Sequence, residues 1–358
     1  MTIDEKLHLF NQVGEEIIER EELKDLLSSG EQLYAYDGFE PSGQMHIAQA
    51  LMRAININRI TSTGVKFKML IGDWHALANN KLGGDLEKIK LVGQYFVEVW
   101  KACGLDMKNI EFVWASDLVK DDTYWMLVLK IAKTNGIKRF IRTAEIMGRD
   151  ESMDLSLAQL IYPAMQCADI FTLGARITQL GMDQRKVNML GREVGPQLGF
   201  WKPVVVSHHM LLGLGTPTTQ TDDKVKRTIE LKMSKSKPDS AIFVTDTYKD
   251  IDRKLRKAWC PEGGISENPI LEYCKYIVFG LHNSLTIERN EEHGGVVTYD
   301  SYEALEKEYA QKKIHPLDLK AAVTTVLDTA LEPIRSHFAT DDTARNLLKQ
   351  IQSFQVTR

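Results

Sequence analysis

The sequence lacks any apolar stretch close to the roughly 20 residues that cross a lipid bilayer, which argues against an integral membrane protein. Its 24 glycines and 10 prolines are too few for a collagen-like or low-complexity chain, and 43% hydrophobic residues argue against disorder. At 358 residues the chain is long enough for two domains that bury their own cores without disulfide or metal staples.

Cysteine is also scarce. The four cysteines lie far apart and show no C-x-x-C spacing: Cys103, Cys167, Cys260 and Cys274. This spacing argues against a zinc site built from cysteines alone, and a disulfide framework is implausible in so long a chain. The N-terminal segment 1–31 is rich in acidic side chains and has no apolar core, unlike a secretory signal or an Arg-rich transit peptide. We therefore expect a cytoplasmic protein with reduced thiols.

Neither sign of charge dominates, because 45 Lys and Arg residues stand against 49 Asp and Glu residues, giving a net charge of −4. Taken as a total, this mild acidity argues against a nucleic-acid partner. The charges are unevenly distributed, however: basic residues outnumber acidic ones six to one over 130–149 and again over 224–238. The distribution therefore permits a polyanionic partner that the total conceals.

Strand and helix patterns alternate over the first half of the chain. Residues 1–30 predict two short helices with apolar residues on one face, and this helical segment ends at Gly30. Strands are predicted within 33–39, 65–74 and 110–116, and the helices between them begin near residue 46 and cover 84–103. Such alternation is typical of βαβ units and predicts an α/β fold with a Rossmann-like, doubly wound parallel sheet.

The later part of the chain departs from this rhythm. Mostly helical residues at about 118–160 predict an insertion, after which a β-branched run at 203–211 resumes the strand pattern. A polar loop then follows at 224–240, and only helical patterns are evident beyond it. We expect three parts: N-terminal helices at 1–32, a Rossmann-like domain at 33–244 and an all-α domain at 245–358.

The first chemical motif is Glu-Pro-Ser-Gly-Gln-Met-His-Ile-Ala-Gln at 40–49, a glycine-bearing turn between a strand and a helix that carries His46. Backbone N–H groups at a helix N-terminus favour phosphate, and a histidine there can donate to a phosphate oxygen as charge develops on it. Taken alone, the motif is weak, because a histidine at a helix start is more often a cap or a surface residue.

The second motif is Lys-Met-Ser-Lys-Ser at 232–236, in which two lysines three positions apart suit a polyphosphate held by a flexible loop. A generic K-x-x-K would be a solvated basic loop. Together with the first motif, far earlier in the chain, it is strongly specific. The pair resembles the signatures of class I aminoacyl-tRNA synthetases, and Tyr-Asp-Gly-Phe-Glu-Pro-Ser-Gly at 36–43 is similar to the tyrosyl branch of archaeal and eukaryotic cytosolic type.

The resemblance extends from about residue 10 to residue 338 and includes several further segments, namely 80–89, 160–170, 181–190, 315–323 and 331–335. It implies a homodimeric ligase that uses ATP with Mg²⁺, without a dedicated protein metal site. L-tyrosine would first be activated to tyrosyl-adenylate with release of pyrophosphate. The tyrosyl group would then pass to the 3′ end of tRNA(Tyr), and no protein nucleophile is required.

The resemblance also assigns the tyrosine pocket. Tyr36 and Asp169 match the pair that holds the phenolic hydroxyl of the substrate. This assignment is chemically reasonable, because a buried phenol needs a hydrogen-bond acceptor and a carboxylate provides one. Tyr162 and Gln166 precede Asp169 on one helical face and would face the α-amino group, with Gln184 completing the pocket. Without the resemblance, Tyr162 and Gln166 would pass for ordinary polar interior residues.

For ATP, the resemblance implies catalytic roles for His46, Gln49, Lys232 and Lys235, with the histidine and the lysines as cations around the reacting phosphate. It implies nucleotide contacts from a wider set of residues, which are Gly38, Gly43, His46, Asp183, Met233, Ser234 and Lys235. Ala48 and Gln49 depart from the family pattern, which has glycine and a second histidine there, and glutamine cannot carry positive charge.

Five residues are implied in tRNA binding. Arg142 and Lys186 match positions near the first base pair of the acceptor stem, within or beside the basic inserted helices. His293, His315 and Asp318 match the anticodon-reading part of the last domain, where Asp318 could instead be a helix N-cap.

Three alternatives stay open. A tryptophanyl-tRNA synthetase shares the fold and both motifs, although an indole N–H needs one acceptor and no hydroxyl partner. A small-molecule adenylyltransferase would need no helical C-terminal domain. A catalytically inactive RNA-binding relative would have no reason to keep both Lys232 and Lys235.

Overall fold

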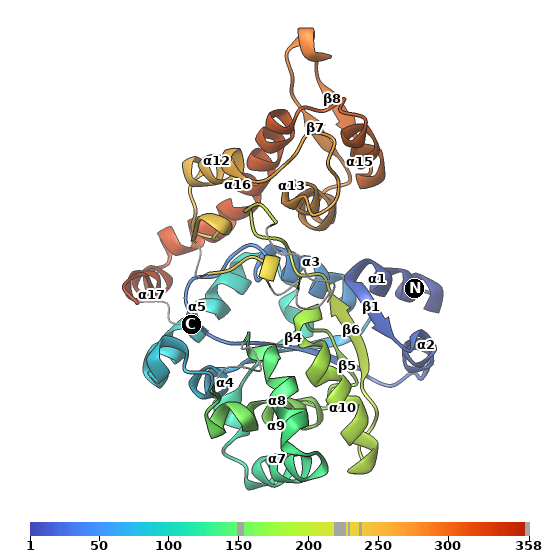
Figure 1. Cartoon of the computed structure of the whole chain (residues 1–358), viewed down its shortest axis with the longest axis vertical. Coiled ribbons are helices and arrows are strands. Elements are labelled where there is room, and N and C mark those ends of the chain that lie inside the picture. Colours follow the sequence, from blue (N-terminus) through green and yellow to red (C-terminus); the bar gives the residue numbers. More distant parts are fainter. Residues whose placement is uncertain (149–153, 218–226, 228–229, 236–237, 355–358) are drawn as a thin grey trace.

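The computed structural model describes residues 1–148, 154–217, 227, 230–235 and 238–354. Figure 1 shows two lobes, with the central sheet and its helices in one and the chain from α12 onward forming most of the other. None of the described helices is both long and apolar enough to cross a membrane.

A six-stranded sheet forms the centre of the larger lobe, in the order β1-β6-β5-β2-β3-β4. All neighbours are parallel except β1 and β6, which are antiparallel. The strands are β1 (Gly14–Ile18), β2 (Tyr34–Phe39), β3 (Lys66–Ile71), β4 (Ile110–Trp114), β5 (Ile177–Thr178) and β6 (Val204–His208). The predicted α/β fold with a largely parallel sheet is therefore confirmed.

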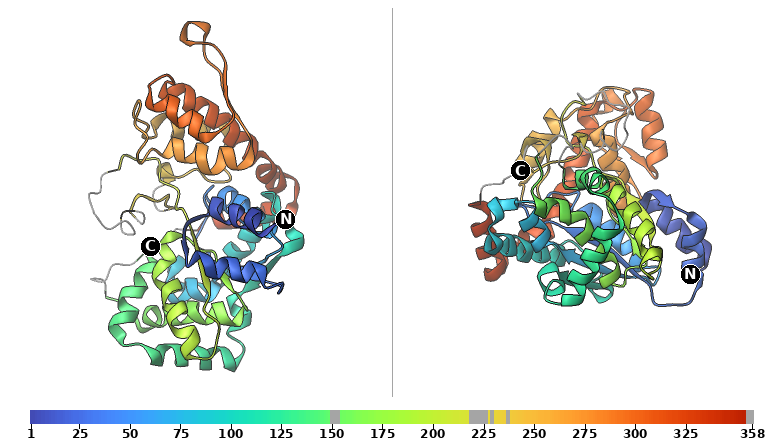
Figure 2. Two further views of the ribbon diagram at one scale, coloured as in Figure 1. Left: turned by 90° about the vertical axis from the view of Figure 1, so that its right-hand side faces the viewer. Right: turned by 60° about the horizontal axis from the view of Figure 1, so that its bottom comes forward.

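Helices cover both faces of this sheet (Figure 2). Apolar side chains of the strands point to both faces and are buried beneath these helices. They are α1 (Ile3–Val13), α2 (Arg20–Ser28), α3 (Leu51–Thr61), α4 (Asp73–Ala78), α5 (Leu86–Ala102), α6 (Ala115–Leu118) and α10 (Arg185–Gln197). The segment 118–160, predicted as an insertion, contains α7 (Asp122–Thr134) and α8 (Ile137–Thr143), and α9 (Leu157–Thr172) begins at its end and continues beyond it. Ser156 caps α9 in a reciprocal capping box with Gln159, which fixes where this site-bearing helix begins.

The second lobe is mainly helical. It comprises α12 (Tyr248–Lys257), α13 (Pro269–Tyr273), a π-helical turn (Cys274–Val278), α14 (Phe279–Leu281), α15 (Tyr302–Ala310) and α16 (Pro316–Thr340). The last helix, α17 (Asp342–Gln352), packs against α5 of the larger lobe. The second lobe also holds a hairpin, β7 (Leu285–Ile287) with β8 (Val297–Tyr299), whose connecting loop projects at the far end of the molecule (Figure 2). The prediction of helices alone beyond residue 245 was wrong at this hairpin, since both strands are too short to show a readable alternation.

Two local predictions need correction. Residues 14–18 are not part of an N-terminal helix but form β1, because Ile17 and Ile18 pair with Val206 and Val205 at the sheet edge. The helix expected from residue 46 begins only at Leu51, since residues 45–47 pair with the chain at 242–244 instead.

Candidate functional site

A cavity of about 880 Å³ opens beyond the carboxyl ends of the parallel strands, where ligands bind in open α/β sheets. Residues at the ends of β2 and β6 line it, together with α9, the short helix Met182–Gln184 and the chain at 230–235. We call residues 230–235 the lysine segment. Segments from opposite ends of the larger lobe's sequence thus contribute to one cavity.

Asp169 lines the cavity and is completely buried. Its Oδ1 atom accepts a hydrogen bond of 2.8 Å from the hydroxyl of Tyr124. Its Oδ2 atom lies 2.9 Å from Nε2 of His75. Burial alone would lower the pKa of His75, but the charge of Asp169 raises it above its ordinary value. These two contacts hold the Asp169 carboxylate in one orientation.

Tyr36 extends from β2 toward Asp169, and its hydroxyl has no well-formed hydrogen bond among the described residues. Burial, followed by the charge of Asp169, raises the pKa of Tyr36 well above its usual range, so the hydroxyl stays protonated. An unpaired buried hydroxyl is costly unless a ligand satisfies it. The Tyr36–Asp169 pair therefore fits a ligand with a phenolic hydroxyl.

Tyr162 and Gln166 lie beside this pair, as their spacing on the helix predicted. The Tyr162 hydroxyl donates to Oε1 of Glu40 at 2.6 Å. Nε2 of Gln166 donates to Oε1 of Gln184 at 3.1 Å, and Gln184 in turn donates to the carbonyl of Ile146 at 3.0 Å. The five residues predicted to bind tyrosine are therefore adjacent in one cavity.

A buried ion pair forms the floor of the cavity. Asp37 lies 2.9 Å from Arg53, and Arg53 also contacts His208 at 3.1 Å and Oε1 of Gln179 at 2.5 Å. Burial raises the pKa of Asp37 to about 6 despite the opposing charge of Arg53. Through the two terminal nitrogens of Arg53, this network joins the end of β2 to the chain after β5 and to β6.

Two lysines of the lysine segment also line the cavity. Nζ of Lys232 lies 2.5 Å from Oδ2 of Asp183, and Nζ of Lys235 donates to Oγ of Ser42 at 3.3 Å. Lys235 also lies over the Phe96 ring, 4.6 Å from its centroid. Burial, with a contribution from the charge of Lys81, lowers the pKa of Lys235 to about 7. An anionic ligand here would favour the charged lysine.

His46 lines the same cavity and pairs through its backbone with Phe243. Burial, followed by the charges of Lys235 and Lys232, lowers the pKa of His46 well below its usual range. This favours the neutral imidazole, which donates from only one ring nitrogen. Burial and the charges of the two lysines therefore oppose the cationic form of His46 that the sequence predicted.

The remaining predicted nucleotide contacts are nearby. Gly38, Gln49, Met233 and Ser234 line the cavity. Gly43 does not, but its φ of 129° lies in a region that suits glycine, so it shapes the turn before His46. Gln49 lies in the turn before α3, with its Oε1 atom buried and unpaired among the described residues, and its carbonyl accepts from Trp100 Nε1 at 3.0 Å.

The residues predicted to bind tRNA are spread outside the cavity. Arg142 is exposed on α8, and Lys186 forms an ion pair with Glu145. His315, rather than Asp318, is the N-cap of α16, since its Nδ1 atom accepts from the Leu317 N–H at 3.2 Å. Asp318 lies in the first turn of that helix. His293 ends a short 3-10 turn in the hairpin loop, and its side chain lies outside the described part of the structure.

Sequence reasoning missed the cavity residues Glu40, Arg53 and His75, and it missed Tyr124, which donates to Asp169 from outside the cavity lining. Glu40 belongs to the first motif, and His75 follows β3 at the sheet edge where sites form, so both positions carried a signal. Arg53 stands out only as a charge on an otherwise buried helix. Across the described ranges, no group of three or more His, Cys, Asp or Glu side chains is arranged to hold a metal ion.

Comparisons with known proteins agree with this geometry. Residues 28–332 match the family model of class I tRNA synthetases for tryptophan and tyrosine (W and Y). A tyrosine–tRNA ligase 1, cytoplasmic, of Arabidopsis thaliana is 48% identical over 359 residues, which cover 99% of this chain and 90% of the relative. The tyrosyl-tRNA synthetase of Pyrococcus horikoshii, solved with L-tyrosine, superposes with a TM-score of 0.90 at 38% identity, covering 98% of this chain and 100% of that one.

A tryptophanyl-tRNA synthetase of Encephalitozoon cuniculi bound to tryptophan also matches, with a TM-score of 0.68 over 98% of this chain and 94% of that one. At 19% identity, this likeness shows the shared fold alone. The tryptophan alternative is therefore less well supported than tyrosine. The chain belongs to the class I tRNA synthetases for tryptophan and tyrosine, within their tyrosine–tRNA ligase branch.

Proposed function

We propose that this protein activates L-tyrosine with Mg-ATP, forming tyrosyl-adenylate and pyrophosphate, and then transfers the tyrosyl group to the 3′ end of tRNA(Tyr). The observation that carries the proposal is that one cavity is lined both by the buried Asp169 carboxylate with the unpaired Tyr36 hydroxyl and by Lys232 and Lys235. The first pair suits a phenol, and the two lysines suit a polyphosphate.

In the amino-acid subsite, Asp169 accepts the hydrogen bond of the substrate phenol, and Tyr36 provides the second hydroxyl partner. Tyr162, Gln166 and Gln184 face the α-amino group, supported by their position in the same cavity. Phenylalanine lacks the hydroxyl that would pair with Tyr36 and Asp169, so the buried Tyr36 hydroxyl would stay without a hydrogen bond, which is costly. Selectivity against phenylalanine then needs no editing domain.

In the activation step, an oxygen of the tyrosine carboxylate attacks the α-phosphorus of ATP, and the bond to the pyrophosphate oxygen breaks. Lys232 and Lys235 neutralise charge on the phosphates, while neutral His46 donates one hydrogen bond and Gln49 assists beside it. Asp183 accepts from the ribose hydroxyls, and Gly38, Met233 and Ser234 shape the nucleotide subsite. Mg²⁺ arrives with ATP and adds charge neutralisation there.

For tRNA, we assign the acceptor stem to Arg142 and Lys186 and the anticodon to His293, His315 and Asp318. The exposure of Arg142 supports phosphate contact. Asp318 is partly exposed in the first turn of α16, where its carboxylate can still accept from a base edge. In this assignment 33–244 is the catalytic domain, extended by 1–32, and 245–358 binds the anticodon.

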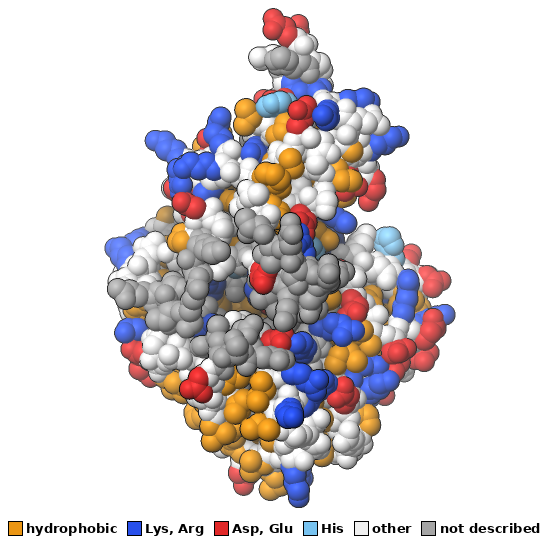
Figure 3. Space-filling view, in the orientation of Figure 1, with side chains coloured by type: hydrophobic (Ala, Val, Ile, Leu, Met, Phe, Trp, Pro, Cys, Tyr) orange, Lys and Arg blue, Asp and Glu red, His pale blue; other side chains and the backbone are white. Residues whose placement is uncertain are grey.

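A homodimer is the proposed assembly. Four large apolar side chains are more than half exposed on the inserted helices α7, α8 and α9, namely Met126, Leu129, Ile137 and Leu157. Figure 3 shows hydrophobic side chains gathered over this lower part of the molecule. Contiguous exposed apolar surface of this kind marks protein interfaces. We further propose a cytoplasmic location, as the name of the Arabidopsis relative states for that protein.

The decisive experiment is amino-acid-dependent ATP–pyrophosphate exchange with tyrosine, tryptophan and phenylalanine in parallel, followed by charging of tRNA(Tyr). Exchange with tyrosine and charging of that tRNA are expected. Exchange with tryptophan alone, or no exchange with any of the three, would contradict the proposal.

A further inference from the structure

The lysine segment is held in place by a short antiparallel pairing with residues 211–213. The Met233 N–H donates to the carbonyl of Leu211 at 2.9 Å, and the Gly213 N–H donates to the carbonyl of Leu231 at 2.8 Å. Leu212 and Lys232 are the paired residues between them. The position of the Lys232 side chain therefore depends on where Leu212 lies.

Leu212 is in turn held by α13 of the C-terminal lobe. Its N–H donates to Oε2 of Glu272 at 3.0 Å, and its carbonyl accepts from the Tyr273 hydroxyl at 3.2 Å. Both polar groups of one backbone residue are thus satisfied by neighbouring side chains on a single helix. Glu272 is only partly exposed, which makes its hydrogen bond to a backbone N–H stronger than one in open water.

His209 fixes Glu272 from the other side. Its Nε2 atom lies 3.0 Å from the same Oε2 atom of Glu272, and its Nδ1 atom lies 3.0 Å from Oε2 of Glu15 in β1. The ring stacks on Tyr276, with centroids 4.4 Å apart and planes within 10°. Tyr276 belongs to the π-helical turn that continues α13, a local irregularity that often accompanies functional sites.

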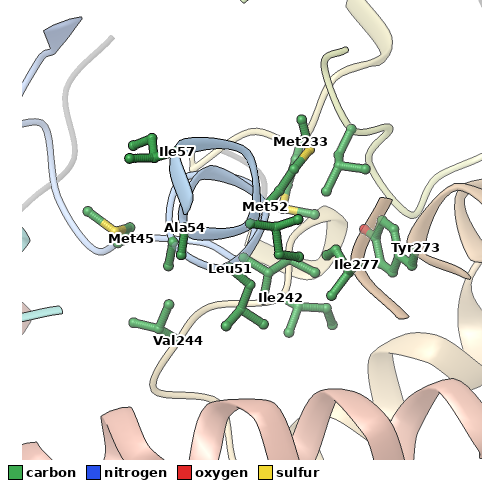
Figure 4. Close-up of a cluster of buried hydrophobic side chains, with 14 of the residues drawn as sticks. Met45, Leu51, Met52, Ala54, Ile57, Met233, Ile242, Val244, Tyr273 and Ile277 are labelled. Carbon is green, nitrogen blue, oxygen red and sulfur yellow. The ribbon is translucent and has the colours of Figure 1, made fainter. Parts of the chain in front are cut away.

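Side-chain packing follows the same route. Met233, between the two lysines, is 4% exposed and belongs to one buried cluster with Met52 of α3 and with Tyr273 and Ile277 of the C-terminal lobe (Figure 4). The cluster connects the helix after the first motif, the lysine segment and α13. A shift of α13 would therefore be transmitted through both hydrogen bonds and packing.

We infer that Glu272 is a positioning residue for Lys232. By binding the Leu212 N–H, Glu272 fixes the position of the lysine segment relative to α13. The C-terminal lobe thereby determines where Lys232 contacts the ATP phosphates. His209 and Tyr273 act with it by orienting the carboxylate and holding the Leu212 carbonyl. The inference rests on the proposed function, in which Lys232 contacts ATP. Glu272 itself lies outside the cavity lining and acts only through the backbone that it holds.

The test compares Glu272→Ala with Glu272→Gln in the full chain, with Glu303→Ala as a matched control. Glu303 is an exposed acid in the first turn of α15, so its removal changes the charge of the same lobe equally. Steady-state ATP–pyrophosphate exchange gives KM for ATP and for tyrosine, and isothermal titration calorimetry gives Kd for ATP alone. Thermal unfolding reports whether each variant is folded.

Glu272→Ala should raise KM and Kd for ATP about tenfold, the ratio expected for one lost hydrogen bond to a charged group, while KM for tyrosine stays unchanged. Glu272→Gln keeps an oxygen that accepts from Leu212 and should recover most of the affinity, and Glu303→Ala should match the unsubstituted protein. Unchanged ATP constants, or an equal rise in KM for tyrosine, would overturn the inference.

If Glu272→Ala does not fold, Tyr273→Phe removes only the hydroxyl that donates to Leu212 and should raise KM for ATP selectively; no change in that variant would overturn the inference. Absence of tyrosine-dependent exchange by the unsubstituted protein would instead contradict the proposed function. The two failures are therefore distinguishable.

Discussion

Lys232 and Asp183 form an ion pair of 2.5 Å across the cavity. The cation proposed to hold ATP phosphates is thus paired with the carboxylate proposed to face the ribose. Lys235 instead donates to the Ser42 hydroxyl and lies over the Phe96 ring. When ATP enters, Lys232 exchanges one anion for another, whereas Lys235 gains a new one.

Because Lys235 gains more from the phosphates, Lys235→Ala should reduce kcat/KM for ATP–pyrophosphate exchange by about 100-fold or more, the scale of losing one preorganised charge-stabilising group. Tyrosine affinity, measured by equilibrium dialysis, should stay close to that of the unsubstituted protein. Lys249→Ala, an exposed change on α12, serves as the control. Equal damage to tyrosine affinity would show that Lys235 supports the cavity as a whole.

ATP binding should take up a proton. With a pKa of about 7, Lys235 is mostly neutral at pH 8, and nearby phosphates raise its pKa, so binding at pH 8 should draw close to one proton from the buffer. At pH 6 the lysine is already charged, and this uptake should largely disappear. Calorimetry in buffers of different ionisation enthalpy measures the uptake, and Lys235→Arg, which stays charged, should abolish it.

Asp169→Asn should narrow the preference for tyrosine over phenylalanine. The amide retains the size of the side chain but loses the charge that accepts from the phenol. The ratio of kcat/KM for the two amino acids should fall by about 10- to 100-fold, the loss expected for a hydrogen bond to a charged group. Parallel exchange assays measure the ratio, and an unchanged ratio would remove Asp169 from its proposed role.

His209 should make stability depend on pH in alkaline solution. Burial alone would lower its pKa, but hydrogen bonds to Glu15 and Glu272 raise it from the ordinary 6.5 to about 9. A raised folded-state pKa gives stability that is complete below pH 6.5 and is lost as the pH rises through 9. The contribution is at most about 3.4 kcal/mol, at about 1.36 kcal/mol for each of the roughly 2.5 pH units between these two pKa values.

Thermal unfolding between pH 6.5 and 9.5 tests this linkage. Across that range, the melting temperature of the unsubstituted protein should fall further than the melting temperature of His209→Asn. Parallel curves for the two proteins would contradict the charge assigned to His209.

Much of the fold was predictable because its elements have local patterns. The alternating and β-branched runs of β2, β3, β4 and β6 predicted the sheet. The edge strand β1 was missed, since Gly14–Ile18 continues a helical pattern and becomes a strand only through pairing with β6, which lies far later in the chain. Strand β5 is too short for any period to show.

The site was predictable only where a motif identifies it. Tyr36, Asp169 and the two lysines carry such motifs, and the structure places them in one cavity. Their supporting contacts, such as Tyr162 with Glu40 and Asp169 with His75, join distant parts of the sequence and cannot be read locally. The pKa of Lys235 likewise depends on burial that the sequence does not reveal.

The burial of Met233 against Tyr273 and Ile277 has a consequence for modularity. We expect that the C-terminal lobe cannot be exchanged between relatives as an independent unit, because its helix completes the core around Met233, a residue of the proposed nucleotide site. A chimera that replaces residues 245–358 must also match Met52, Leu212 and Met233 to the incoming helix. In such chimeras, the two lobes and the segment that joins them should therefore be replaced together.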